Sequence, residues 1–577
     1  MMKPLKRGRS MSEPARASAT LRLALLAVIL AACGLVATTW HEFGHTWDEP
    51  EHIAAGMALL DRGHYDFDIQ HPPLARLLLA LGPYLAGARS QGNPPPDGRP
   101  EGLAILYGSG HYDLYLSAAR AGTLPFLALL LVCTWLWGRR CVGSPGALLA
   151  VLFVATTPAV LGHAGLATLD VAAAATCLLT LYALWLWLAS GSWRNVVLLG
   201  LAAGLAIGTK LSAIPFVAVG GVGLVAARLL ATRPGQTPFA GATGARRAAG
   251  VLVALTIVAV ILTLAYGGRI IFLTDQTHRY NQALGYLFGY AGRVHDLAYS
   301  VAAHVPVPEA FQWLIGGIQA ITVHNDNGHL SYLLGETRTS GWWYFYIVAL
   351  LAKTPLPLLA FGLPGLALQA HTGWRERKSA LLAPALMFLG LLLFASLYSH
   401  INIGVRHLLV LYPLLAIGAS HAVLTAWRHL HSGARARRWP GPGLAALAAA
   451  LAWQAGGIVA AYPDYLAYFN EAVRTPEYVL VDSDLDWGQD LRRLSRRLKE
   501  LEVPRLALAY LGTALLDREG LPPYELLPPD RPATGWIAVS ALARVYGRGG
   551  YAWLDAYAPR ERVGKSIDLY FIASPAR

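Results

Sequence analysis

Acidic and histidine residues are concentrated directly after the first long apolar run of the sequence, residues 21–40. The cluster covers residues 41–52 and has the sequence HEFGHTWDEPEH. Carboxylates beside imidazoles can move protons in a reaction, and at the edge of an apolar run they suit a substrate that is partly dissolved in lipid. The two halves of this cluster predict two different mechanisms.

The first half matches the H-E-x-x-H pattern, with His41 and His45 as zinc ligands and Glu42 as the base that activates water. This pattern requires a helix that places both imidazoles on one face, one turn apart. The pentapeptide is similar to that of intramembrane metalloproteases, although the distal Asp ligand in a Leu-Asp-Gly setting is missing from this chain. An intramembrane zinc metalloprotease is therefore the alternative hypothesis.

The second half of the cluster contains Asp48 and Glu49. A carboxylate just outside a membrane can take a proton from an acceptor hydroxyl while a lipid-linked sugar presents its anomeric carbon. The same two residues also suit the cap and the first turn of a helix that begins with Pro50. Capping and catalysis are compatible, so both interpretations stay open.

The composition places these residues in an all-α polytopic membrane protein. Of the 577 residues, 55% are hydrophobic and 14% are charged, against roughly 25% charged in soluble domains. We expect about eleven spans, because apolar stretches of about 20 residues recur along the chain. These stretches are 21–40, 118–138, 145–162, 166–189, 195–228 (two spans), 248–273, 343–367, 379–398, 407–427 and 443–461.

Charge placement orients the spans. Lys and Arg gather in residues 1–20, a basic tail, and in alternate loops, which are therefore expected in the cytoplasm. The first loop 41–117, the long loop 274–342 and the region 463–577 then lie outside. The net charge of +13 follows from this topology and from lipid contact, so no nucleic-acid partner is implied.

We expect residues 21–462 to form a transmembrane catalytic module and 463–577 a small external α/β domain. An amphipathic helix opened by Pro72 and Pro73 is predicted within the first loop. In the last region, strand-like runs alternate with one basic helix. The predicted strands are 478–481, 505–510, 536–539 and 567–572, and the predicted helix is 490–501.

Three motifs occur in one order on the predicted external side: Asp48-Glu49, then His71-Pro72-Pro73-Leu74, then Thr168-Leu169-Asp170. With Gly-Thr-Lys at 208–210 and the segments 402–407 and 484–490, this order resembles the GT-C superfamily of polyprenyl-phosphate-sugar glycosyltransferases. That superfamily includes the protein O-mannosyltransferases and the lipid A aminoarabinose transferases. The resemblance implies a bacterial inner-membrane enzyme that moves a hexose or pentose from an undecaprenyl-type carrier to a lipid, polysaccharide or protein acceptor on the periplasmic face.

An inverting transfer needs one base at the acceptor and cations at the departing phosphate. We predict Asp48 as the base, with Glu49 and Asp170 as carboxylates that orient the acceptor, support Asp48 or hold a cation. His71 and Pro72 are expected to line the acceptor site or to shape the loop. The candidate donor-binding cations, each of which could also extend to lipid headgroups, are Arg120, Lys210, Arg269, Lys353 and Arg406.

The sequence leaves the cofactor question open. A divalent cation at the carboxylates is compatible with the resemblance, and zinc belongs only to the protease hypothesis. A transporter or flippase is the third hypothesis, and it is weakened because the sequence shows no inverted repeat of its apolar stretches. The identities of sugar and acceptor are not determined by any motif.

Overall fold

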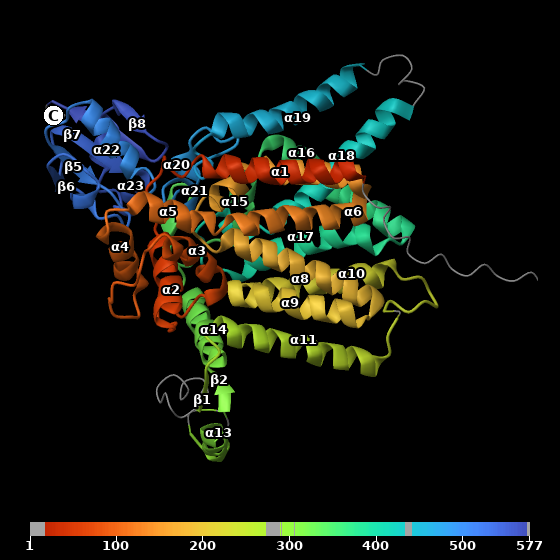
Figure 1. Ribbon diagram of the computed structural model, residues 1–577. Coiled ribbons are helices and arrows are strands. Elements are labelled where there is room, and N and C mark those ends of the chain that lie inside the picture. Colours follow the sequence, from red (N-terminus) through yellow and green to blue (C-terminus); the bar gives the residue numbers. More distant parts are fainter. Residues whose placement is uncertain are drawn as a thin grey trace, which may run out of the picture.

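The computed structural model describes residues 18–239, 241–272, 289, 291–304, 306–432 and 441–573. Long helices lie side by side in one bundle, and a small sheet lies beyond one end of it, next to the helices of the first loop (Figure 1). The predicted fold class, a polytopic helical protein with a small C-terminal α/β region, is confirmed.

Ten helices of the described residues make up the bundle: α1 (Ala19–Ala37), α6 (Leu124–Ala155), α8 (Asp170–Ser190), α9 (Trp193–Thr209), α10 (Ala213–Ala231), α11 (Gly244–Ala265), α16 (Leu356–Glu376), α17 (Ser379–Tyr398), α18 (Leu411–Ser432) and α19 (Gly441–Ala461). Among the described residues, 7 helices are long and apolar enough to cross a membrane. Helix α9 is equally apolar but shorter. The total of about eleven spans stays a prediction.

Helix α6 contains a reversal of the chain. Gly143 has a φ of 77°, a left-handed value that glycine adopts without steric cost. The two halves then pack face to face, since a Cβ on Gly138 would lie 2.9 Å from the Cα of Ala147. At the open end, the Thr123 hydroxyl donates to the Leu166 carbonyl at 2.8 Å. Residues 123–166 therefore form a helical hairpin, as the separate apolar stretches 118–138 and 145–162 predict.

Four helices of the first loop cover one end of the bundle: α2 (Glu49–Arg62), α3 (Pro73–Leu85), α4 (Gly98–Gly108) and α5 (Tyr112–Ala121). Helix α3 is the helix predicted after Pro72. Helices α2 and α3 touch at Gly56, where a Cβ would meet the Arg76 carbonyl. The fully buried Arg76 forms an ion pair with Asp68 and donates to the Tyr65 hydroxyl at 2.8 Å, which fixes the loop between the two helices.

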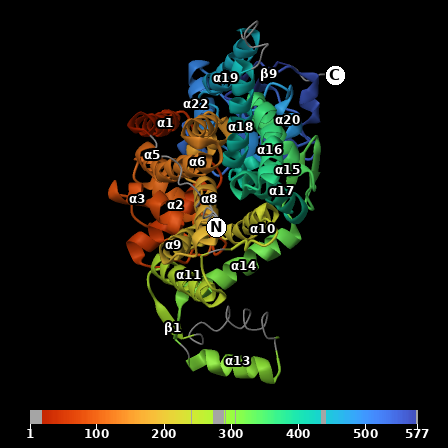
Figure 2. The same ribbon diagram turned by 90° about the vertical axis from the view of Figure 1, so that its right-hand side faces the viewer.

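The region between α11 and α16 extends away from the bundle and returns. Strands β1 (Ile270–Phe272) and β2 (Pro306–Pro308) pair antiparallel, and α13 (Arg293–His304) lies between them in the chain. Helix α14 (Glu309–Asn327) then leads back along the end of the bundle (Figures 1 and 2). A short hairpin follows, made of β3 (Ser331–Leu333) and β4 (Glu336–Arg338), before α15 (Phe345–Lys353).

The C-terminal region contains a mixed five-stranded sheet with the order β6-β5-β7-β9-β8. Its strands are β5 (Leu506–Ala509), β6 (Tyr524–Leu526), β7 (Gly535–Ser540), β8 (Glu561–Val563) and β9 (Ile567–Ile572). The short helical segments around the sheet are α20 (Pro476–Val479), α21 (Asp482–Leu485), α22 (Leu491–Glu500) and α23 (Ala541–Tyr546). Leu491, Leu494 and Leu498 of α22 pack on one face of the sheet.

Three of the four predicted strands and the predicted basic helix are confirmed as β5, β7, β9 and α22. The strand predicted at 478–481 is wrong. Its first two residues end the short helix α20, which starts at Pro476 because the fixed φ of proline suits a helix start.

Candidate active site

A cavity of about 560 Å³ lies where the first loop, α8, α10, α14, α17 and the segment before α18 meet. The polar residues of its lining, which we call the polar side, include Asp48, His52, His71, Asp170, Lys210, Arg406 and His407. The apolar residues of its lining, which we call the apolar wall, include Ile214, Phe216, Ile318, Ile321, Phe394 and Tyr398. The cavity is therefore lined by both charged and apolar groups.

A row of alternating charges crosses the polar side. Asp48 Oδ2 lies 2.7 Å from Arg406 Nη1, which lies 3.7 Å from Asp170 Oδ2. The other oxygen of Asp170 lies 2.7 Å from Lys210 Nζ. The structure thus brings four of the predicted site residues together from segments that are far apart in the sequence.

Exposure distinguishes the two carboxylates of this row. The side chain of Asp48 is 26% exposed, whereas that of Asp170 is 2% exposed. Asp48 makes no side-chain capping bond to α2, although it precedes that helix. Asp48 is therefore the carboxylate that a substrate in the cavity can reach, and Asp170 holds the two cations in place.

Arg406 is positioned by a short 3-10 helix, η1 (Val405–Leu408), that precedes α18. Gly404 before it has a φ of 131°, and a Cβ there would lie 2.4 Å from the Ser483 hydroxyl. The backbone N–H of Val405 donates to both oxygens of Asp484, at 3.1 and 3.3 Å. The C-terminal segment thus holds the backbone that presents Arg406.

The same C-terminal segment also holds the first loop. The N–H of Gly44 donates to the Gln489 carbonyl at 3.0 Å, and the N–H of Trp47 donates to the Trp487 carbonyl at 3.2 Å. Between these contacts the Trp487 indole lies under the guanidinium of Arg406, 4.3 Å from its Cζ to the ring centroid. Residues 482–490 therefore connect both halves of the Asp48–Arg406 ion pair.

The acidic residues of this C-terminal segment are mostly structural. Asp486 accepts hydrogen bonds from the N–H groups of Leu542 and Gly488, at 2.7 and 3.2 Å. Burial nevertheless raises the pKa of Asp486 to about 7. Burial likewise raises the pKa of Asp482 to about 6, although Arg406 opposes that shift.

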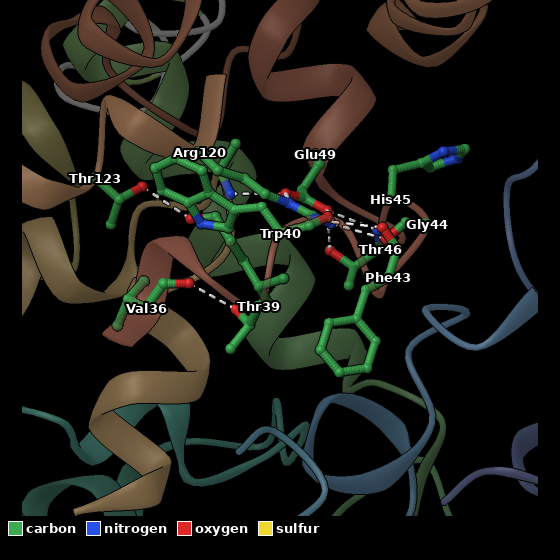
Figure 3. A network of polar contacts seen from close by, with 12 residues as sticks. Val36, Thr39, Trp40, Phe43, Gly44, His45, Thr46, Glu49, Arg120 and Thr123 are labelled. Carbon is green, nitrogen blue, oxygen red and sulfur yellow. Dashed lines mark hydrogen bonds and ion pairs between the residues drawn. The ribbon is translucent and has the colours of Figure 1, made fainter. Parts of the chain in front are cut away.

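Glu49 has a different environment from its neighbour Asp48. Its carboxylate forms a bidentate ion pair with Arg120, with Nε to Oε1 and Nη2 to Oε2 both at 2.8 Å (Figure 3). It also accepts from the N–H groups of Thr46 and Ala167, each at 2.8 Å. Burial alone would raise the pKa of Glu49, but Arg120 and these donors hold it below its usual value.

The Glu49–Arg120 pair is fully buried and does not line the cavity. Arg120 also donates to the Gly44 carbonyl at 2.7 Å. The pair therefore fastens α2 and the segment before it to α5. Its contacts give a reason to regard both residues as supports of the site, in place of the catalytic and phosphate-binding roles that the sequence predicts.

Two further predicted cations lie away from the cavity. Lys353 is buried and donates to the carbonyls of Leu466 and Asp484, at 2.8 and 2.5 Å. Arg269 lies at the base of the β1–β2 ribbon, where its guanidinium is 3.0 Å from His64 Nδ1. Neither side chain faces the charge row, so the structure brings only Lys210 and Arg406 of the five predicted cations to it.

His71 and Pro72 take separate positions. The His71 imidazole lines the cavity, and burial lowers its pKa to about 4, so the ring is neutral at physiological pH. The His71 carbonyl accepts from Arg76 and Tyr65. Pro72 is the N-cap of α3 and shapes the loop.

The geometry contradicts the zinc-protease alternative. Residues 41–46 form a turn and an extended segment, so His41 and His45 are not on one helix face. The His45 ring is occupied, with Nδ1 2.8 Å from the Tyr112 hydroxyl and Nε2 3.2 Å from the Thr513 hydroxyl. The Glu42 carboxylate pairs with Arg496 at 2.7 Å. The segment stays extended because its backbone bonds to the C-terminal region replace helical bonds.

The charge row also does not fit a divalent cation. Each of its two carboxylates is already paired with a cationic side chain, and the charges of the four groups cancel. Within the ranges described above, no group of three or more His, Cys, Asp or Glu residues is arranged to hold a metal ion.

Several cavity residues escape the sequence-based selection. His407 adjoins Arg406 and has its Nδ1 2.8 Å from the Tyr346 hydroxyl. His324 and Asn325 come from α14, in the loop region without an assigned site. Trp487 does not line the cavity, but it supports Arg406 and has no role of its own in the sequence-based selection. His407 directly follows a predicted site residue and lies within the segment 402–407 of the resemblance, and these two signals could have indicated it.

Comparison with known proteins agrees with this architecture. Residues 62–267, just over a third of the chain, match the family model described as dolichyl-phosphate-mannose-protein mannosyltransferase. No curated protein sequence matches the chain significantly. The S. cerevisiae protein O-mannosyltransferase Pmt1-Pmt2 complex bound to the sugar donor has a similar fold, with a TM-score of 0.50, 12% identity, and coverage of 78% of this chain and 90% of that one.

Two other solved structures are similar to this chain. ArnT from Cupriavidus metallidurans bound to undecaprenyl phosphate has a TM-score of 0.47 and 14% identity, with coverage of 97% of this chain and 100% of that one. The archaeal oligosaccharyltransferase AglB from Archaeoglobus fulgidus, in complex with an inhibitory peptide and a dolichol-phosphate, has a TM-score of 0.47, 12% identity, and coverage of 91% and 70%.

The chain thus shares its fold with the Pmt1-Pmt2 complex, and its residues 62–267 are similar to the mannosyltransferase family model. Both findings agree with the resemblance to the GT-C superfamily of polyprenyl-phosphate-sugar glycosyltransferases.

Proposed function

We propose that this protein transfers a sugar from a polyprenyl-phosphate carrier to an acceptor hydroxyl on the external, periplasmic side of the bacterial inner membrane. The observation that carries the proposal is the cavity itself, in which the row Asp48–Arg406–Asp170–Lys210 adjoins an apolar wall. A sugar phosphate on a long hydrocarbon chain needs both surfaces in one place.

Asp48 is the base of this reaction. Its carboxylate takes the proton of the acceptor hydroxyl, and the acceptor oxygen attacks the anomeric carbon from the side opposite the phosphate. The bond between that carbon and the phosphate oxygen breaks, and its electron pair leaves with the polyprenyl phosphate. The configuration at the anomeric carbon is therefore inverted.

Lys210 and Arg406 stabilise the charge that builds on the leaving phosphate. Lys210 gives a mobile ammonium and Arg406 a planar guanidinium with several donors, and both line the cavity beside the apolar wall. Asp170 keeps both cations oriented, because its two oxygens face one cation each. The hydrocarbon of the carrier lies against Phe216, Ile318 and Phe394.

The test is mass spectrometry of the lipid that co-purifies with an Asp48→Asn variant. Loss of the base lowers turnover by about 10² to 10⁴, while the contacts to the donor remain, so the donor stays bound and its mass identifies both carrier and sugar. Asp113→Asn is a matched control, since that carboxylate is 61% exposed and lies away from the cavity. Unchanged transfer by Asp48→Asn refutes the base, and lipids without a sugar phosphate refute the donor class.

A further inference from the structure

Helix α13 has one apolar face that no other part of the described chain covers. Val294, Leu297 and Val301 recur at helical spacing and are 65%, 66% and 54% exposed. Arg293, Asp296 and Ser300 form an adjacent polar face, centred about 100° from the apolar one on the helical wheel. Among the described residues, α13 has few contacts with other elements, and β1 is its principal neighbour.

The orientation of α13 differs from that of the bundle. Figure 2 shows the bundle helices end-on, whereas α13 lies across the view and apart from them. Along the horizontal bundle axis of Figure 1, α13 has the same position as the end of α11 from which the β1–β2 ribbon emerges. A membrane crossed by α11 would therefore have its surface near the level of α13, with the axis of α13 along that surface.

The end of α11 next to the ribbon also exposes apolar residues. Leu264, at the end of α11 next to the ribbon, is 69% exposed, and Val260 one turn earlier is also exposed. The polar side of α13 carries one cation and one anion in Arg293 and Asp296, so its attraction to a bilayer rests on apolar contact more than on headgroup charge.

We propose that α13 is an interfacial helix whose face of Val294, Leu297 and Val301 lies in the outer surface of the lipid bilayer. This contact has a consequence for the cavity, because the chain runs from α13 through β2 directly into α14. Ile318, Ile321 and His324 of α14 line the cavity. The lipid contact of α13 therefore anchors the helix that closes one side of the site.

The test uses the full chain in nanodiscs of phosphatidylethanolamine and phosphatidylglycerol. Nitroxide labels are placed on single cysteines at positions 297 and 301 and, as matched controls, at 296 and 300, in a background without Cys33, Cys133, Cys141 and Cys177. Collision with oxygen, which partitions into lipid, is compared with collision with a water-soluble nickel chelate. We expect the ratio of oxygen to nickel accessibility to be several-fold higher at 297 and 301 than at 296 and 300.

Two results overturn the proposal. Equal nickel accessibility on both faces places α13 in water, and an apolar face shielded from both reagents means that it is covered by a protein or by a second copy of this chain. A label at Val323 of α14 tests the anchoring. Leu297→Asp should increase its mobility, whereas Ser300→Asp, which adds the same charge to the polar face, should not, and equal effects of the two variants contradict the anchor.

Discussion

The Trp487 indole lies 4.3 Å from the guanidinium of Arg406, whose Nη1 is 2.7 Å from Asp48 Oδ2. A residue of the C-terminal region thus supports the ion pair that joins the first loop to the segment before α18. Because the indole covers the guanidinium at the distance of a cation–π contact, it limits the positions that Arg406 can adopt beside Asp48.

Removal of this ring should therefore impair the reaction more than the fold. We expect Trp487→Ala to lower turnover about tenfold, in line with about 1 to 2 kcal/mol for a desolvated cation–π contact, while Trp487→Phe keeps most of the activity. The control is Trp536→Ala, which removes a similar stack on Arg560 at 4.8 Å outside the site. Equal turnover of Trp487→Ala and the parent protein would contradict this role.

The Glu49–Arg120 pair should act on stability. Glu49→Gln leaves the buried guanidinium of Arg120 without its counter-charge, which typically costs about 3 to 5 kcal/mol. The midpoint of thermal unfolding in detergent should fall clearly. Glu42→Gln removes a partly exposed partner of Arg496 and should change the midpoint little, by about 1 kcal/mol or less. A small effect of Glu49→Gln would argue against the structural role.

The geometry at Gly404 predicts a loss of function from a single methyl group. The Cβ added by Gly404→Ala would lie 2.4 Å from the Ser483 hydroxyl, and the φ of 131° at this position is disfavoured for L residues. The helix η1 must therefore shift, and Arg406 shifts with it. Transfer should fall at least about tenfold. Gly457→Ala in α19, where the added methyl meets no atom, should keep activity and stability. Normal turnover of Gly404→Ala would show that η1 tolerates the shift.

The two lysines predicted as donor-binding residues should behave differently. Lys210→Gln should weaken binding of undecaprenyl phosphate to the purified protein about 10- to 100-fold, the usual worth of a charge-assisted hydrogen bond. Lys353→Met should lower thermal stability and leave that affinity nearly unchanged, because Lys353 contacts backbone carbonyls outside the cavity. Native mass spectrometry with added undecaprenyl phosphate measures the affinity of both variants. Weakened binding by Lys353→Met together with unchanged binding by Lys210→Gln would reverse the roles of the two lysines.

Acid should destabilise the protein through His45. Burial lowers the pKa of His45 to about 4, with a smaller opposing effect of Glu49. Between the ordinary value of about 6.5 and 4, the unfolded state binds a proton that the folded state does not, so stability falls with falling pH. The loss amounts to about 2 kcal/mol at pH 5 relative to pH 7.5. The measurement is the midpoint of thermal unfolding as a function of pH. His45→Gln should reduce the fall of this midpoint between pH 7.5 and pH 5, and an unchanged fall would assign the acid sensitivity to other groups.

The sequence could predict Asp170, Lys210 and Arg406 because each interrupts or borders an apolar run, where an ionisable group is costly unless it has a function. Asp48 was predictable because it belongs to the acidic cluster that follows the first apolar run. The sequence could not separate Asp48 from Glu49. The two are neighbours in the chain, but at the start of a helix successive side chains diverge by about 100°, so one faces the cavity and the other Arg120.

Contacts between segments that are far apart in the chain could not be predicted from the sequence either. Nothing near Trp487 indicates a partner 81 positions earlier, at Arg406, and the run 484–490 has the composition of an ordinary turn and helix start. Strands β5, β7 and β9 were predictable from buried apolar runs, whereas the edge strands β6 and β8 are three residues long and largely polar. Helix α13 lies in a loop whose hydropathy is too low to indicate any span.

The hydrogen bonds from Gly44 to Gln489 and from Trp47 to Trp487 also determine when, during synthesis, the first loop can acquire these contacts. The first loop emerges from the ribosome early, but its partners at 487–489 are synthesised after every helix of the bundle. During translation the segment around Asp48 therefore lacks its C-terminal partners until the last stage of synthesis. A nascent chain that stalls in α19 has the other helices of the bundle but lacks the contacts that hold the segment before Asp48.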